Sequence, residues 1–191
     1  MVAVTGAAVS GESTRDRFQL GLWHLAGLLL GAGVLGLLMS ATGEVAGLPD
    51  RPILVALGAL MVGCGVAALG GRPVPVPSSR AQVPRAWRYT MTPAQYAFAY
   101  GVGLGLGLTT RVLSVSLYAL VLLIAVAGDV RVGVPLAIAY AITRALPVFL
   151  ALARPDAPRL IDGGDRWRAR ALALDGAVVA GAGMTLVAFG L

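Results

Sequence analysis

One run of 33 residues, 95–127, most constrains what this chain can fold into, because it is almost wholly apolar and its only charged side chain is that of Arg111. As a single straight helix the run would be about 50 Å long, whereas the hydrocarbon core of a bilayer is about 30 Å thick. It therefore predicts either two membrane spans or one span whose helix is interrupted.

The rest of the chain has the composition of a membrane protein. It is 58% hydrophobic and 13% charged, whereas about 25% of the residues in a soluble domain are charged. Four further apolar segments are each long enough for a span of about 20 residues: 18–41, 52–70, 132–153 and 171–191. The sequence predicts an all-α fold, a polytopic integral membrane helical bundle.

Two polar segments complete the predicted domain organisation. Residues 1–17 form a polar N-terminal tail, without the charged-then-apolar order of a signal peptide. Residues 18–191 then form a single transmembrane domain. Within it, residues 71–94 are a basic, proline-rich loop with no acidic residue, which we expect to lie against lipid at the cytoplasmic face.

The distribution of arginine decides between the two topologies. If residues 95–127 cross once, the tail, the basic loop and residues 154–170 all lie on the cytoplasmic side, as the positive-inside rule requires. If they cross twice, the arginine-rich segment 154–170 is forced outside. We therefore predict five spans, one of them interrupted, with the N-terminus cytoplasmic and the C-terminus outside; six spans is the alternative.

The basic character of the chain also bears on its partners and source. All fifteen basic residues are arginine, and with the abundant Ala, Gly, Val and Leu this indicates a GC-rich, actinobacterial type of genome and the bacterial inner membrane. Arginines that border apolar spans are selected by membrane topology. The net charge of +6 therefore does not indicate nucleic acid, and we expect membrane lipids and another membrane protein or a second copy as partners.

Glycine recurs at every second position from Gly101 to Gly107 within the long run. The spacing does not match a dinucleotide fingerprint, and an isolated strand in lipid would leave its backbone unpaired. A helix weakened by about 1 kcal/mol per glycine remains. Such a helix can be interrupted, as in transporter binding sites, or can pack closely on another helix, and both interpretations stay open.

Charged residues inside the predicted spans indicate either a structural clamp between two helices or a site for an anion or a proton. Arg144 lies near the middle of one span and Asp175 near the start of the last, and we predict that they pair, with Tyr140 nearby. The predicted substrate or ion path contains Gly103, Gly105, Gly107, Thr109, Thr110, Arg111, Tyr140, Arg144 and Asp175.

Enzyme chemistry finds little support in the residue inventory. The chain has one cysteine, Cys64, and one histidine, His24, which we expect to be packing residues. We therefore expect no catalytic residue, no metal and no cofactor, although an enzyme is not excluded.

Residues 99–150 resemble the second half of the cytochrome c biogenesis transmembrane family, the CcdA and DsbD membrane domains that carry electrons between thiols. The glycine run, the small step at Gly128, Tyr140 and Pro147 follow the order of that family. The resemblance covers about residues 20–190 and implies a helical membrane fold. The redox cysteine pair is absent, because Thr109, Thr110 and Arg111 stand where the family has Thr-Pro-Cys.

Two functions follow from these observations. The resemblance and the interrupted span favour movement of a small solute or ion rather than of electrons, since dithiol exchange needs two thiols. The alternative is a non-catalytic subunit or assembly factor of a larger membrane complex, such as a respiratory or cytochrome-maturation complex.

Overall fold

The computed structural model describes residues 14–47, 51–72, 74, 86–107, 115–152 and 164–190. In these residues it contains helices and no strand, which confirms the all-α prediction for this part of the chain. The helices are α2 (Thr14–Ala46), α3 (Arg51–Leu69), α4 (Trp87–Thr90), α5 (Pro93–Gly105), α6 (Val115–Ala127), α7 (Val130–Leu152) and α9 (Gly164–Gly190).

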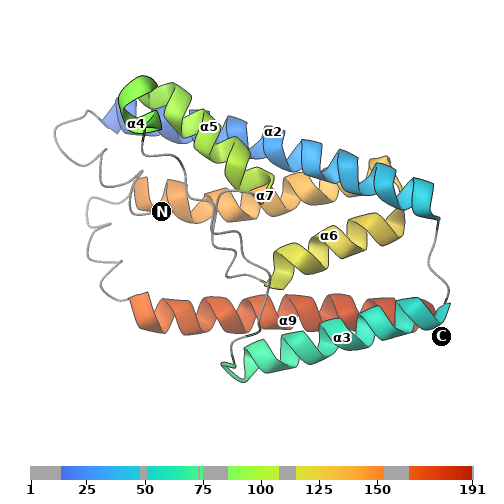
Figure 1. Ribbon diagram of the computed structural model, residues 1–191. Coiled ribbons are helices and arrows are strands. Elements are labelled where there is room, and N and C mark those ends of the chain that lie inside the picture. The colour runs from blue at the N-terminus through green and yellow to red at the C-terminus, as the bar shows by residue number, and fades with distance from the viewer. Residues whose placement is uncertain are drawn as a thin grey trace.

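The long helices form two groups that α6 connects (Figure 1). Helices α5 and α7 pack on α2, and α3 packs on α9, while α6 crosses obliquely between the groups. We call the two ends of the bundle the Thr14 end and the Ala46 end, after the first and last residues of α2. Helices α3 and α7 return from the Ala46 end to the Thr14 end, and α9 runs to the Ala46 end again.

The long apolar run follows α2 from one end of the bundle to the other. Gly27 of α2 faces the carbonyl of Phe98 in α5, and Gly43 near the end of α2 faces the carbonyl of Ala125 in α6. Figure 1 shows that α5 ends about halfway along the bundle and that α6 runs from about halfway to the Ala46 end. Residues 93–127 therefore contain two helices of 13 residues each, which run in the same sense and do not form a hairpin.

Helices α3 and α9 meet backbone to backbone through glycines spaced seven apart. Gly58 lies opposite Gly183 and Gly65 lies opposite Gly176, so the pair is antiparallel. A Cβ added to Gly183 would lie 2.6 Å from the carbonyl oxygen of Gly58. Small residues at such positions allow two helices in lipid to approach and gain van der Waals contact.

The apolar core has two parts, and α6 contributes to both. Ile124, which is fully buried, belongs with Leu28 of α2 and Ala141 of α7 to the first part. Ala119 belongs with Val179 of α9 to the second. Helix α6 is uniformly apolar because it has neighbours on opposite sides.

Several segment boundaries differ from the prediction. The last residues of the predicted polar tail, 14–17, belong to α2, where Asp16 in the first turn suits the positive end of the helix dipole. The predicted loop 71–94 contains α4, and α9 begins at Gly164, inside the segment predicted to be a charged loop. Residues 1–13 lie outside the described residues.

In the part of the chain that the structure describes, two helices are long and apolar enough to cross a membrane: residues Arg15–Ala46 within α2, and Arg51–Leu69, which is α3. Shorter apolar stretches cover Val115–Ala127 and Leu172–Ala188. These lengths and compositions support membrane association, and the number of crossings stays a prediction.

Candidate functional site

The glycine run contains the C-terminal end of α5. The helix starts with a capping box, in which Thr92 accepts the backbone N–H of Gln95 and Gln95 accepts that of Thr92. It ends at Gly105, and Gly107 follows with a φ of 73°. A residue with a side chain adopts that left-handed conformation only at a cost, so Gly107 favours termination of the helix there.

The earlier glycines of the run serve packing instead. A Cβ on Gly101 or on Gly105 would collide with backbone carbonyls of α2, those of His24 and Leu28. Gly103 is buried as well. The two interpretations of the run are therefore both correct, each for a different part: the first glycines allow close packing and the last one follows the end of the helix.

Asp175 of α9 binds the start of α6. Its Oδ2 accepts the backbone N–H of Val115 at 2.9 Å, in a partly buried setting. The first N–H groups of a helix have no partner within it, and they carry the positive end of the helix dipole. A carboxylate from a different helix thus caps α6, although the two residues are 60 positions apart.

The surroundings of this contact are apolar. Val115 packs against the core part that contains Met61, Ala119 and Val179. In such surroundings an ionised carboxylate is costly unless hydrogen bonds and dipoles compensate it. Asp175 is therefore the described residue best placed to bind a cation or a proton at the junction of α5 and α6.

The structure does not bring Arg144 and Asp175 together. Arg144 lies on α7 close enough to Tyr100 of α5 for its charge to act on the phenol, and its Nη1 is buried without a hydrogen-bond partner. Asp175 instead lies beside Val115. Tyr140 packs on the core beside α2, and its carbonyl accepts the hydroxyl of Thr143 at 2.7 Å.

Three predicted path residues, Thr109, Thr110 and Arg111, lie outside the described residues. The others lie on different helices: Gly103, Gly105 and Gly107 at or just after the end of α5, Tyr140 and Arg144 on α7, and Asp175 on α9.

Sequence reasoning missed an aromatic stack beside Arg144. The ring of His24 stacks on that of Tyr100, with ring centroids 5.6 Å apart. The ring of Tyr96 also stacks on that of Tyr100, with centroids 6.4 Å apart. His24 is only 3% exposed. The spacing of four between the tyrosines was the available signal, since it places both rings on one face of a helix.

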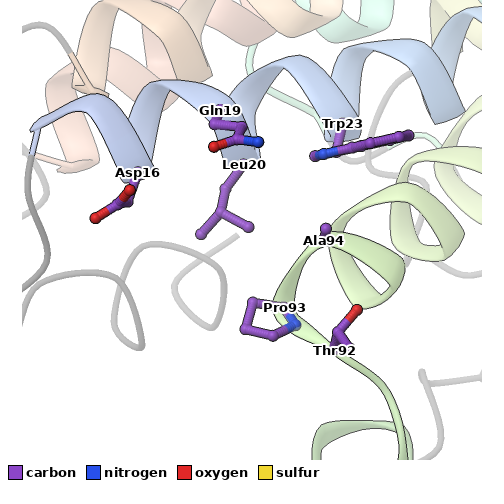
Figure 2. Close-up of a pocket in the computed structure, with 7 residues that line it drawn as sticks. All are labelled: Asp16, Gln19, Leu20, Trp23, Thr92, Pro93 and Ala94. Atoms are coloured by element: carbon purple, nitrogen blue, oxygen red, sulfur yellow. The ribbon is translucent and has the colours of Figure 1, made fainter.

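A shallow cleft opens at the Thr14 end, between the first turns of α2 and α5 (Figure 2). Its volume is about 260 Å³. Figure 2 shows Leu20 pointing from α2 toward Pro93, with Asp16 at one side of the cleft and Trp23 at the other. The cleft lies far along α2 from the junction of α5 and α6, so it does not extend the Asp175 site.

Metal chemistry has no basis in the described part of the chain, which contains no group of three or more His, Cys, Asp or Glu side chains that could hold a metal ion. Cys64 is half-buried on α3.

Comparison of the chain with protein-family models, with curated proteins and with solved structures finds no match.

Proposed function

We propose that the protein is a multi-pass membrane protein with five crossings, formed by α2, by α3, by α5 and α6 together, by α7 and by α9. The two apolar helices of sufficient length support this proposal. So does the arrangement of α5 and α6. Each has 13 residues, about 20 Å, which is too short to span alone, whereas the two in sequence extend along α2.

The distribution of arginine supports an N-terminus in the cytoplasm of a bacterial cell and a C-terminus outside. Eleven of the fifteen arginines lie in residues 1–17, 71–94 and 154–170, which adjoin helix ends at the Thr14 end. Only Arg51 and Arg131 adjoin helices at the Ala46 end. By the positive-inside rule the Thr14 end is the cytoplasmic one.

The protein moves a small solute or ion through the interrupted crossing, with Asp175 as the binding residue. The observation that carries this proposal is the hydrogen bond from the Val115 N–H to the Asp175 carboxylate at the start of a half-length helix. Interrupted helices whose ends face a central site are the usual arrangement in transporters, where helix ends and acidic side chains bind ions.

Flux measurements in vesicles test this proposal. The purified protein is reconstituted into liposomes that contain a pH-sensitive or a sodium-sensitive dye, and a membrane potential is imposed. We expect a protein-dependent flux of protons or sodium that Asp175→Asn reduces about tenfold or more, because the neutral side chain loses the charge that binds the cation.

Asp129→Asn is the matched control. Asp129 also accepts a backbone N–H at the start of a helix, that of Arg131 at 2.8 Å, but it is exposed. Its substitution is expected to leave the flux unchanged. Equal loss in both variants, or no flux from the unmodified protein, would refute the proposal.

A non-catalytic subunit or assembly factor is the second candidate function. An apolar groove of about 460 Å³ on α3 and α9 favours it, with the lining residues Ala59, Val62, Met184, Val187 and Ala188. A single apolar helix of a partner protein suits such a groove. Extraction in mild detergent tests this function: a stoichiometric membrane partner supports it, and Met184→Arg, which introduces a charge into the groove, is then expected to release that partner.

The resemblance to thiol-disulfide electron carriers adds no electron transfer to either proposal. Dithiol exchange needs two thiols that can pair, and the chain holds only Cys64.

A further inference from the structure

Three polar side chains from three helices lie near one another in the half of the bundle toward the Thr14 end: His24 of α2, Tyr100 of α5 and Arg144 of α7. The imidazole of His24 stacks on Tyr100 at 5.6 Å, with the ring planes 28° apart. Arg144 lies in the neighbourhood of the same tyrosine. We call these three residues the polar cluster.

Two atoms of the polar cluster are buried without a hydrogen-bond partner, Nδ1 of His24 and Nη1 of Arg144. Buried polar atoms in folded proteins are almost always hydrogen-bonded, and a buried guanidinium without compensation costs several kcal/mol. Arg144 lies eight residues before the end of α7 at Leu152, about 12 Å along the helix. It therefore lies inside the proposed hydrocarbon region and not at its edge.

The four acidic residues whose side chains the structure describes lie at other places. Asp175 is at the start of α6 and Asp129 at the start of α7. Glu44 lies beside Gly128 at the Ala46 end, and Asp16 lines the cleft at the start of α2. The positive charge of Arg144 thus has no acidic counterpart among these four residues.

The remaining groups of the polar cluster suit a negative ligand. A guanidinium has only donors, a phenol donates through its hydroxyl, and a neutral imidazole donates through one ring nitrogen. Donors that converge in a water-poor setting bind anions through short, charge-assisted hydrogen bonds. The apolar walls, which include Leu28, Ala141 and Ala145, strengthen these bonds by lowering the local dielectric.

We propose that His24, Tyr100 and Arg144 form a binding site for a small anion between α2, α5 and α7. The ligand is a halide or a single phosphate group, as in a lipid headgroup. The site is separate from the Asp175 site and does not require that the protein transports anything, so it can be measured in detergent on the full chain.

Thermal unfolding of the purified chain provides the test. The protein is kept in a maltoside detergent without phosphate lipid, and gluconate, which is bulky, is replaced by chloride at constant ionic strength. A ligand that binds only the folded protein raises the midpoint temperature with its concentration. In a second arm phosphatidylglycerol is added to the micelles at fixed gluconate concentration, which separates a headgroup ligand from a free anion.

We expect the midpoint temperature to rise with chloride, with phosphatidylglycerol or with both, and we expect Arg144→Gln to weaken the apparent affinity about tenfold or more. Tyr100→Phe keeps the aromatic stack and removes one donor, so a loss of about threefold to tenfold is expected. Arg131→Gln is the matched control, because Arg131 is on the same helix and exposed, and it is expected to respond as the unmodified protein does.

If Arg144→Gln does not fold, Tyr100→Phe and Arg144→Lys are measured instead. Arg144→Lys is expected to retain part of the anion affinity because it retains the positive charge. The proposal is overturned if the unmodified protein responds in neither arm. It is equally overturned if the folded Arg144 and Tyr100 variants respond as the unmodified protein does, or if Arg131→Gln loses the response too.

Discussion

Replacing Gly65 by alanine is expected to separate two helices that position the proposed ion site. A Cβ on Gly65 would lie 2.6 Å from the carbonyl oxygen of Gly176, and ordinary contact begins at 3.4 Å. Backbone must therefore shift by about 0.8 Å, since no flexible side chain can yield instead. Overpacking of this kind costs about 1–3 kcal/mol. Gly176 also directly follows Asp175, so the same shift acts on the hydrogen bond to Val115.

Gly63→Ala is the control for this substitution, because Gly63 is on the same helix and an added Cβ meets nothing within 4 Å. Both changes gain about 1 kcal/mol of helix propensity. The difference in unfolding free energy between the two variants therefore isolates the collision, and we expect Gly65→Ala to be less stable than Gly63→Ala by about 1–3 kcal/mol. Unfolding in mixed micelles measures this difference. Equal stability of the two variants would refute the close packing of α3 and α9.

Three further predictions concern the ends of helices and the topology. Gly107→Ala places a side chain at a φ of 73° and is expected to cost about 1–2 kcal/mol in thermal unfolding, whereas Gly33→Ala, with open space around it, is not. Thr92→Ala removes the capping box of α5, so it is expected to lower the free energy of unfolding by about 1 kcal/mol and to accelerate hydrogen exchange over residues 93–97. Thr42→Ala is the control and is expected to leave that exchange unchanged. The orientation is tested by cysteine labelling in a Cys64→Ala background, at two exposed positions, Val45 near the end of α2 and Tyr89 in α4. An impermeant maleimide applied to intact cells is expected to label Val45→Cys, and to label Tyr89→Cys only after permeabilisation. The opposite pattern would contradict the proposed orientation.

The helical class and the glycine run were predictable because their signals are local. Glycine lowers helix propensity wherever it occurs, so the end of α5 near Gly107 follows from the sequence. The length of residues 95–127 likewise excluded a single straight span. Both arguments need no knowledge of the neighbouring helices.

The partners of the charged residues were not predictable, because they depend on which helices become neighbours. Sequence spacing allowed Arg144 to pair with Asp175, but α7 packs on α2 and α9 packs on α3. Asp175 therefore lies beside Val115 of α6, and Arg144 lies beside Tyr100. His24 was expected to be only a packing residue, since nothing local connects it with a tyrosine 76 positions away.

The glycine-lined contact between α3 and α9 has a consequence for biosynthesis. Nearly half of the chain lies between the end of α3 and the start of α9. In the proposed membrane topology, α3 is made long before its packing partner α9, and its glycine face contacts acyl chains until α9 has been synthesised. Contacts between segments so distant in sequence form late and slowly. Translation that stops before residue 164 leaves an orphaned α3, a natural substrate for membrane quality-control proteases.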